Sequence, residues 1–475
     1  MTTLTNPILE GLFGNIIEDA DSYKLGHYVT YPANTRFVEL YLESRGGVYD
    51  KTVFFGMQYI LKAYLTTPVT HAMVDEMRDT AAWHGVSFNE AGFRRIVNEL
   101  DGRFPVCIRA VREGQVVPTH NVLATITNTH PDFYWLPAYL ETILMRVWYP
   151  TTVCTMSWDI KQFLRRQLHA TSDRAEDELP FKLHDFGSRG VSSRESAAVG
   201  GMAHLVNFKG TDTLVALKLA HLVYAADKPG FSINATEHSS HITWGRENEF
   251  ASYRNALKHF GKPGGLFACV SDSYDIYNAI EKGWAGELKA ELIASGATLV
   301  VRPDSGEPSL VAPRCLALLE KGFGATVNSK GFKVLNGVRM IWGDGMNRTS
   351  LRELVATVRD AGYSIENMAF GMGGGLLQKL DRDTQKFALK CCAIDVGGTW
   401  HAVAKDPVTD PGKVSKMGRQ TLLRHRETGE FRSANPSEAG VNGWLDVLHM
   451  VYRDGQVVKE YTFDDIRARA DVPVL

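Results

Sequence analysis

The stretch TLVVRPDSGEP, residues 298–308, joins a short apolar run to a charged turn. Thr298 to Val301 favour a strand, and Arg302 and Asp304 follow at once on either side of a proline. The same design recurs after residue 180, where apolar runs end in Gly, Asp or Arg and a helical pattern follows. Further examples are KLHDFGSRG from residue 182, LFACVSDSYD from 266, VRMIWGDGMN from 338 and MAFGMGGGLLQKL from 368.

Strands that alternate with helices in this way predict a parallel sheet with right-handed crossovers. The charged and glycine residues fall just after each strand, at its carboxyl end. In α/β barrels this is the face on which active sites are built. We therefore expect Arg302 and Asp304 to meet functional residues from the neighbouring strand ends.

The two ends of the chain have a different pattern. Strand-like runs at residues 36–42, 104–112 and 121–127 flank a helical pattern at 54–65, which predicts a mixed α+β region. From about residue 400 the chain returns to strands and turns, and it ends in a short helical pattern around 463–470.

The composition is that of an ordinary globular protein. The 475 residues are 44% hydrophobic and 22% charged, and the formal net charge is −2, which argues against a nucleic-acid-binding protein. The six cysteines form no C-x-x-C pair, so we expect a reducing compartment rather than a disulfide framework. Neither a targeting segment nor a transmembrane run is recognisable, so we expect a cytoplasmic protein without membrane contact.

The glycine-rich run GMGGGLLQKL, residues 371–380, favours a phosphate site at a helix start, because backbone amides there can approach an anion. It is neither a dinucleotide fingerprint, since Leu376 occupies the last glycine position, nor a P-loop. The alternative is a tight turn, but Arg382 and Lys390 follow and add positive charge. Asp344, in WGDG, is either a turn residue or a ligand contact.

Several single residues have two interpretations each. His238 and His241 are three apart, which fits a metal pair poorly and a reactive, phosphate-contacting or structural histidine better. Phe186 is either a core residue or a platform for a flat ring, and Asp212 either caps a helix or accepts a ligand hydrogen bond. Arginines, lysines and aspartates at strand ends together suit an anionic, hydroxyl-rich ligand such as a sugar phosphate.

An ordered set of motifs extends across nearly the whole chain. The motifs are DSYK (21–24), ETILMRVWYP (141–150), KLHDFGSRGVSS (182–193), HLVNFKGTDT (204–213), EHSS (237–240), VSDSYDIYNA (270–279), VRPDSGEP (301–308), GDG (343–345), GGGLLQKLDRD (373–383), KDPVTDP (405–411) and FDDIR (463–467). This set, in this order, resembles the nicotinamide phosphoribosyltransferase family, within the type II phosphoribosyltransferase group. The segment after the first strand, SRGGVYDKT, is shorter than in the animal members.

The resemblance implies an irregular α/β barrel at 181–385 and a second, mixed α+β domain. That domain is built from residues 1–180, with a helical connection, and the returning segment 386–475. A homodimer with two shared active sites is implied as well. The implied reaction joins nicotinamide to 5-phosphoribosyl-1-pyrophosphate, giving nicotinamide mononucleotide and pyrophosphate. Magnesium and ATP, the latter coupled through a phosphohistidine, are the implied cofactors.

The resemblance also assigns residues. Phe186, with Tyr23 of the partner chain, would sandwich the pyridine ring, and Asp212 would accept the carboxamide N–H. Arg302 and Asp304 would lie beside the ring and ribose, while His238 would carry the phosphoryl group with Asp275 as its acidic neighbour. Gly343, Asp344 and Gly374 would hold the ribose and 5′-phosphate side, and Arg189 would contact the ligand near the ring and the phosphate. The basic positions around the phosphates would be Arg45, Arg382, Lys390 and Lys405.

Two positions depart from the family pattern: Met372 stands where serine is common, and Ser188 stands where tyrosine is common. The magnesium ligands are not assigned by any motif. The alternatives left by the sequence are a nicotinate phosphoribosyltransferase and a non-catalytic ligand-binding protein on the same scaffold.

Overall fold

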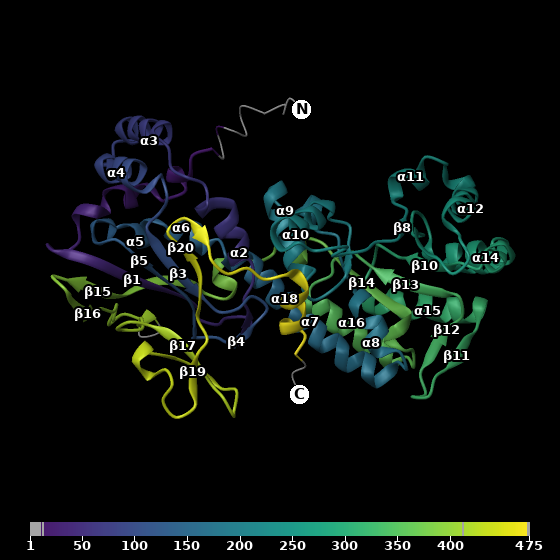
Figure 1. Ribbon diagram of the computed structural model, residues 1–475. Helices are drawn as coiled ribbons and strands as arrows, with labels where there is room; N and C mark the ends of the chain where they lie inside the picture. Colours follow the sequence, from purple (N-terminus) through teal and green to yellow (C-terminus); the bar gives the residue numbers. More distant parts are fainter. Residues whose placement is uncertain (1–10, 12–13, 411–412, 473–475) are drawn as a thin grey trace. The chain divides into compact units, whose positions relative to one another are not determined.

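The computed structural model describes residue 11, residues 14–410 and residues 413–472 (Figure 1). The chain divides into two compact units, each described here by itself. The first unit comprises Met1–Thr155, Val223–Ala225 and Asp381–Ala470. The second unit comprises Met156–Leu222, Ala226–Leu380 and Asp471–Leu475. The first unit is therefore built from both ends of the sequence.

The second unit is organised around a parallel sheet of seven strands in the order β7-β6-β14-β13-β10-β9-β8. Every neighbouring pair in this order is parallel. The strands are short and apolar, and Val338, Leu299 and Phe267 are fully buried, as expected where helices cover a parallel sheet. The strands are β6 (Leu183–Asp185), β7 (Gly210–Thr211), β8 (Asn234–Ala235), β9 (Leu266–Val270), β10 (Thr298–Arg302), β13 (Val338–Trp342) and β14 (Met368–Met372).

Helices connect successive strands of this sheet, which is why the strands can run parallel (Figure 1). A small hairpin, β11 (Ala325–Val327) with β12 (Lys333–Leu335), is also part of the unit. The helices are α8 (Ala175–Glu178), α9 (Arg194–His204), α10 (Leu214–Tyr224), α11 (His238–Ile242), α12 (Glu249–Phe260), α13 (Ile276–Asn278), α14 (Lys289–Ser295), α15 (Pro308–Phe323), α16 (Arg348–Asp360) and α17 (Gly374–Leu377).

The first unit is organised around a second sheet of seven strands, in the order β16-β15-β1-β5-β3-β20-β21. Its pairs are antiparallel, and strands from the carboxyl-terminal segment pair with β1 and β3 from the amino-terminal segment. The strands are β1 (Thr35–Ser44), β3 (Val106–Ala110), β5 (Val122–Asn128), β15 (Phe387–Val396), β16 (Thr399–Ala402), β20 (His449–Arg453) and β21 (Gln456–Val457).

Two smaller sheets and several helices complete the first unit. Its core packs Leu40 and Ile126 of the large sheet against Phe93 and Leu136 of the helices. The small-sheet strands are β2 (Lys51–Val53), β4 (Val116–Pro118), β17 (Thr421–His425), β18 (Phe431–Ala434) and β19 (Trp444–Asp446). The helices are α2 (Met57–Ile60), α3 (His71–His84), α4 (Glu90–Leu100), α5 (Leu136–Tyr139), α6 (Glu141–Met145) and α18 (Phe463–Ala470), and α7 (Trp148–Thr171) continues from this unit into the other.

The predicted fold class is confirmed: a curled, barrel-type parallel sheet accompanies a separate mixed unit with an antiparallel sheet. The barrel sheet has β7 and β8 as its edge strands, so it is a half-barrel. The helix expected at 54–65 is present as α2 followed by a π-helical turn, Leu61–Leu65. In the described part of the chain, no helix combines the length and apolarity needed to cross a bilayer.

Candidate active site

The carboxyl ends of the parallel strands carry the predicted residues of the second unit, as the recurring sequence design indicated. Arg302 ends β10, and Asp304 lies two residues beyond it. Because all seven strands are parallel, these ends meet at one edge of the sheet. The others are Phe186 after β6, Asp212 after β7, His238 after β8, Asp275 after β9, Gly343 and Asp344 after β13, and Gly374 after β14.

The ring of Phe186 is held by glycines on the neighbouring strands. A Cβ atom at Gly371 would lie 2.0 Å from Phe186 Cε2, and one at Gly343 would lie 3.1 Å from the same atom. Side chains at these two positions would therefore collide with the ring. Phe186 is half-buried, so one part of its surface is packed and another remains accessible for stacking.

Asp212 is held by two neighbours that donate hydrogen bonds to it. His184 Nε2 lies 2.9 Å from Asp212 Oδ1, and Ser232 Oγ donates to the same oxygen at 2.6 Å. Burial by itself raises the carboxyl pKa, but the contacts with His184 and Ser232 and the charge of Arg302 outweigh it, so the pKa of Asp212 is lowered. Asp212 is therefore an ionised acceptor, and its side chain remains 48% exposed.

Arg302 and Asp304, from the opening stretch, face each other across Pro303. Arg302 Nη2 lies 3.9 Å from Asp304 Oδ2. Among the described residues, the buried Nε atom of Arg302 has no hydrogen-bond partner, so it is a donor still available to a ligand. Burial, followed by the nearby carboxylates Asp272 and Asp344, raises the pKa of Asp304 despite the opposing charge of Arg302.

His238 contacts Asp272 rather than the expected Asp275. His238 Nε2 lies 2.8 Å from Asp272 Oδ1. The other oxygen of Asp272 accepts from the Asp304 amide at 2.9 Å and from Ser305 Oγ at 2.5 Å. The expectation for Asp275 is corrected, because its carboxylate caps α13 by accepting from two backbone amides of that helix.

The alternative of a metal pair at His238 and His241 finds no support. His241 lies inside the unit, where its Nδ1 is 2.7 Å from Ser252 Oγ and its Nε2 is 3.5 Å from Cys269 Sγ. Burial, and then the charges of His238 and Arg302, lower the pKa of His241 to about 4. Within the described ranges, no three His, Cys, Asp or Glu side chains group in a way that could hold a metal ion.

The glycine-rich stretch after β14 forms an open turn rather than a long helix. The helix that follows, α17, has only four residues. A Cβ atom at Gly374 would meet nothing within 4 Å, so this face is open to a ligand, and Gly190 packs beside it. Arg189, in the turn Ser188–Gly190, and Asp344, after β13, are both exposed.

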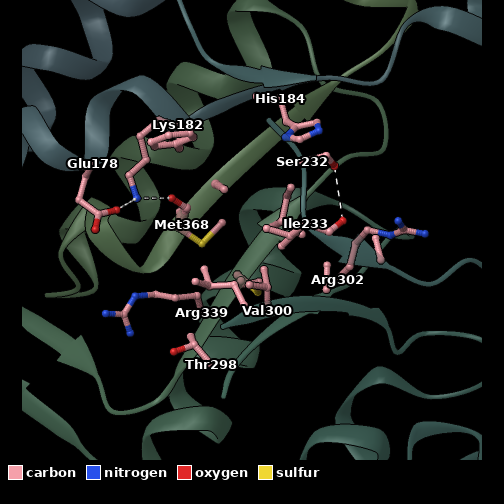
Figure 2. Close-up of a pocket in the computed structure, with 18 of the residues that line it drawn as sticks. Glu178, Lys182, His184, Ser232, Ile233, Thr298, Val300, Arg302, Arg339 and Met368 are labelled. Carbon is pink, nitrogen blue, oxygen red and sulfur yellow. Dashed lines mark hydrogen bonds and ion pairs between the residues drawn. The ribbon is translucent and has the colours of Figure 1, made fainter. Parts of the chain in front are cut away.

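A pocket of about 530 Å³ extends along the inner face of the parallel sheet (Figure 2). Its apolar floor is formed by Ala268, Val300 and Ile341 on neighbouring strands. One end is lined by Phe186, Asp212 and Arg302. At the opposite, amino-terminal end of the strands, Lys182 Nζ lies 2.8 Å from Glu178 Oε2, near Arg339 and Glu366. The pocket is large enough for an aromatic ring and leads away from the strand ends.

Five of the predicted residues belong to the first unit. Tyr23 is 60% exposed. Arg45 donates to Glu43 Oε1 at 2.6 Å, and its buried Nη2 atom has no partner among the described residues. Burial, with the charges of Arg45, Lys24 and Lys405, lowers the pKa of Lys390 although Glu141 opposes this. Arg382 is exposed beside Asp383, and Lys405 follows β16.

Three residues of the second unit were not selected from the sequence. His184 and Ser232 bond to Asp212, and Asp272 bonds to His238. His184 and Asp272 do lie in motifs at strand ends, and this position could have identified them. Ser232 lies in the segment FSIN, which is not a recognisable strand-end motif. It comes close to Asp212 because the preceding residue, Phe231, pairs with Gly210 of β7.

Fold and site together define a phosphoribosyltransferase-type α/β protein, and comparisons with known proteins agree. The family model described as "Nicotinate phosphoribosyltransferase (NAPRTase) family" matches residues 181–455, and "Nicotinamide phosphoribosyltransferase, N-terminal domain" matches residues 15–108. The chain therefore belongs to the nicotinate phosphoribosyltransferase family, with the amino-terminal domain found in its nicotinamide branch.

Individual relatives support this assignment. A nicotinamide phosphoribosyltransferase of Xanthomonas campestris pv. campestris is 56% identical, over 96% of this chain and 98% of the relative. A protein of the same name from Acinetobacter baylyi is 29% identical, over 96% and 97% of the two chains. The crystal structure of a nicotinate-nucleotide pyrophosphorylase from Pyrococcus furiosus has a TM-score of 0.60 at 14% identity, covering 99% of this chain and 97% of that one, and supports the fold.

Proposed function

We propose that the protein is a nicotinamide phosphoribosyltransferase that makes nicotinamide mononucleotide for NAD biosynthesis. The observation that carries this proposal is the ionised Asp212, bonded to His184 and Ser232 at the end of a ring-sized pocket beside Phe186 and Arg302. A carboxylate there accepts the N–H of a carboxamide, while the phenyl ring stacks on the pyridine. The amino-terminal domain and the names of the relatives support the same substrate.

The reaction needs orientation rather than a strong base. The lone pair of the pyridine nitrogen forms a bond to ribose C1′ of 5-phosphoribosyl-1-pyrophosphate. The C1′–oxygen bond breaks, and its electron pair leaves with pyrophosphate. Placing the two reacting atoms in contact and stabilising the departing negative charge are the contributions expected from the protein. Phe186 and Asp212 would orient the ring, and Asp304 would lie beside the ribose.

The phosphate groups require positive charge and open backbone. Arg189 and Gly374 supply these in the second unit, where Gly343 and Asp344 would border the ribose. In the first unit, the buried and unpartnered Nη2 of Arg45 is a donor suited to a phosphate oxygen. Arg382, Lys390 and Lys405 would add further cations from the same unit.

Nicotinate, the substrate of the alternative reading, would place a carboxylate against Asp212. Two like charges in contact can cost several kcal/mol, whereas about 1.4 kcal/mol already gives tenfold discrimination. Because the pKa of Asp212 is lowered, protonation near neutral pH would not relieve the repulsion. The site geometry therefore favours nicotinamide over nicotinate.

ATP hydrolysis would be coupled through His238. Asp272 accepts from Nε2, which leaves the lone pair of Nδ1 for the γ-phosphorus of ATP. As the Nδ1–phosphorus bond forms, the bond to the ADP oxygen breaks and ADP leaves. Asp272 also holds the Asp304 amide and Ser305 Oγ, so it connects His238 to the loop after β10.

Magnesium would be bound jointly by the protein and its substrate. The described residues include no cluster that could hold a metal alone. Mg²⁺ commonly keeps its waters and binds one or two carboxylates together with substrate phosphates. Asp304 and Asp344 fit this mode, since both lie at strand ends and the charge of Asp344 contributes to the raised pKa of Asp304. When bound there, the ion would supply positive charge to the pyrophosphate.

The proposal includes a homodimer in the cytoplasm. Tyr23 is largely exposed within its own unit and so is accessible for a partner chain's pyridine site. All six cysteines are free thiols, and a reducing compartment would keep them so.

A product assay with both pyridines tests the function directly. The protein is incubated with 5-phosphoribosyl-1-pyrophosphate, Mg²⁺ and either nicotinamide or nicotinate, and the mononucleotide is quantified. We expect nicotinamide to give the larger kcat/KM by more than tenfold. A larger value with nicotinate would assign the alternative enzyme, and no product from either pyridine would favour a binding protein.

A further inference from the structure

A group of basic residues in the first unit takes no part in the function proposed above. Arg112 follows β3, His449 begins β20, Lys459 lies between β21 and α18, and Arg469 lies near the end of α18. Lys459 and Arg469 lie over the ring of Tyr461, which precedes α18 by two residues, and Arg112 contacts His449. We call Arg112, His449, Lys459, Tyr461 and Arg469 the Tyr461 cluster.

The members of the Tyr461 cluster are close to one another. Lys459 Nζ lies 5.9 Å from the centre of the Tyr461 ring, and Arg469 Cζ lies 4.9 Å from it. Arg112 Nε donates to His449 Nε2 at 3.1 Å. The charge of the Arg112 guanidinium also acts on the pKa of each of the other four residues, so it lies near all of them.

Two buried polar atoms of this cluster lack partners. Tyr461 is only 8% exposed, and neither its hydroxyl nor Arg469 Nη2 has a hydrogen-bond partner among the described residues. Within the same described ranges, Arg112, Lys459 and Arg469 form no ion pair with an Asp or Glu side chain. Buried polar atoms in native proteins are normally bonded, so these atoms indicate a missing acceptor.

The carboxylates nearby are already bound to other groups. Glu113 accepts from the Gln58 amide at 2.6 Å and from the Tyr224 hydroxyl at 2.7 Å. Asp446 accepts from Arg109 at 2.7 Å, and Glu460 lies 2.5 Å from Lys62 Nζ. Asp465 accepts from the Thr462 amide at 3.4 Å. None of them forms an ion pair with the Tyr461 cluster, although the charges of Asp465 and Glu113 oppose the lowered pKa of Arg469 and that of Asp446 opposes the lowered pKa of His449.

In the protein without a bound anion, the positive charges of the Tyr461 cluster therefore repel one another. Burial, and then Lys459 and Arg112, lower the pKa of His449 to about 4. Burial, and then Arg112 and Arg469, lower the pKa of Lys459 as well. An anion with several acceptor oxygens would relieve the repulsion and satisfy the two unpartnered donors.

We propose that the Tyr461 cluster is a binding site for a phosphate dianion, held by Arg112, Lys459 and Arg469 with the Tyr461 hydroxyl as a further donor. It is separate from the phosphate-side residues of the same unit. Arg45 follows β1 and Lys390 lies in β15, whereas Arg112 follows β3 and His449 begins β20, and β5 lies between β1 and β3. The dianion is either free phosphate or the phosphate of a monoester.

The test compares full-length variants by calorimetric titration with inorganic phosphate. We expect Arg112→Gln and Lys459→Gln each to weaken binding by about tenfold or more, while Lys459→Arg, which keeps the charge, retains it. Arg424→Gln is the matched control, because Arg424 is an exposed arginine of β17 outside the cluster. Phosphate that binds at active-site residues contributes equally to the titrations of all these variants. A difference in affinity between the variants therefore reports binding at the Tyr461 cluster.

Thermal unfolding gives a second measurement that does not depend on activity. Without phosphate, Lys459→Gln should unfold at the wild-type temperature or above it, since it removes a repelled charge. With phosphate, the stabilisation seen for the wild type should be reduced. Repeating the titration with AMP distinguishes the two sources of the dianion. If the variants lose affinity for AMP as they do for phosphate, the ligand is a phosphate monoester. If their affinity for AMP is unchanged, the ligand is free phosphate.

Unchanged phosphate affinity in the Arg112→Gln/Lys459→Gln double variant would overturn the proposal. A double variant that loses affinity but also unfolds early without phosphate would overturn it too, since the cluster would then be structural. Neither result changes the outcome of the pyridine assay, so this inference and the proposed function are tested independently of each other.

Discussion

His238 Nε2 lies 2.8 Å from Asp272 Oδ1, and the second oxygen of the same carboxylate holds the Asp304 amide at 2.9 Å. One buried side chain, 3% exposed, thus connects the histidine after β8 to the loop after β10. A change at His238 can therefore reach Asp304 through a single residue. In the proposed function, this link would be the physical basis for coupling ATP to the synthetic reaction.

The first prediction concerns this link. Asp272→Asn should reduce the ATP-dependent gain in synthesis by about tenfold or more, because a hydrogen bond to a charged group contributes about 1.5–3 kcal/mol. His238→Ala should abolish ATPase activity and keep some uncoupled synthesis, since the histidine does not attack the ribose. ADP release and mononucleotide formation are measured with and without ATP.

Asp275→Asn is the control for this prediction. Asp275 caps α13, so its replacement should cost at most about 1 kcal/mol of stability and leave ATP coupling intact. Intact coupling in Asp272→Asn, or lost coupling in Asp275→Asn at full stability, would contradict the link.

The second prediction concerns the choice of pyridine. Asp212→Asn removes the negative charge that repels nicotinate, so the ratio of kcat/KM for nicotinamide over nicotinate should fall by about tenfold or more. Ser232→Ala should lower the ratio less, because His184 still bonds to Asp212. A ratio that does not move in Asp212→Asn would exclude this carboxylate as the selector.

The third prediction tests the ring platform. Gly371→Ala places a Cβ atom 2.0 Å from Phe186 Cε2, so the ring must shift. Overpacking of this kind costs about 1–3 kcal/mol, and we expect KM for nicotinamide to rise by about tenfold. Gly374→Ala adds its methyl group to open space and should instead raise KM for 5-phosphoribosyl-1-pyrophosphate. Equal effects of both variants on both substrates would argue against separate subsites.

The fourth prediction concerns stability and pH. Burial raises the pKa of Glu113, although hydrogen bonds from the Gln58 amide and the Tyr224 hydroxyl oppose the shift. The folded protein therefore binds a proton that the unfolded chain releases above about pH 4.3, and stability falls as pH rises through the folded pKa. Glu113→Gln should remove this slope from unfolding free energies measured between pH 4 and pH 8. An identical slope in the variant would assign it to other groups.

The fifth prediction tests a shared active site. Tyr23→Ala and Asp212→Ala chains should each be inactive alone. Mixed under conditions that permit subunit exchange, they should recover part of the activity, because a hybrid dimer retains one intact site. Exchange demonstrated by mass spectrometry without recovered activity would place Tyr23 and Asp212 in the same chain's site.

The recurring strand-end design predicted most of the site before the fold was known. TLVVRPDSGEP and its counterparts placed Phe186, Arg302 and Asp304 at the ends of parallel strands, and the structure has them there. This worked because a short apolar run and the glycine or charge that ends it are local signals. The acidic neighbour of His238 could not be chosen in this way, since SDSYD offers two aspartates three residues apart.

The sequence by itself determined the fold class, the strand ends and the residue types available for phosphate and ring binding. Tertiary structure decided which of these residues meet. Asp272 rather than Asp275 reaches His238, because Asp275 is used by the amides that begin α13. Ser232 reaches Asp212, and Arg112 reaches His449 in the Tyr461 cluster. Such contacts join residues far apart in the chain, and only the packing of strands and helices determines their distances.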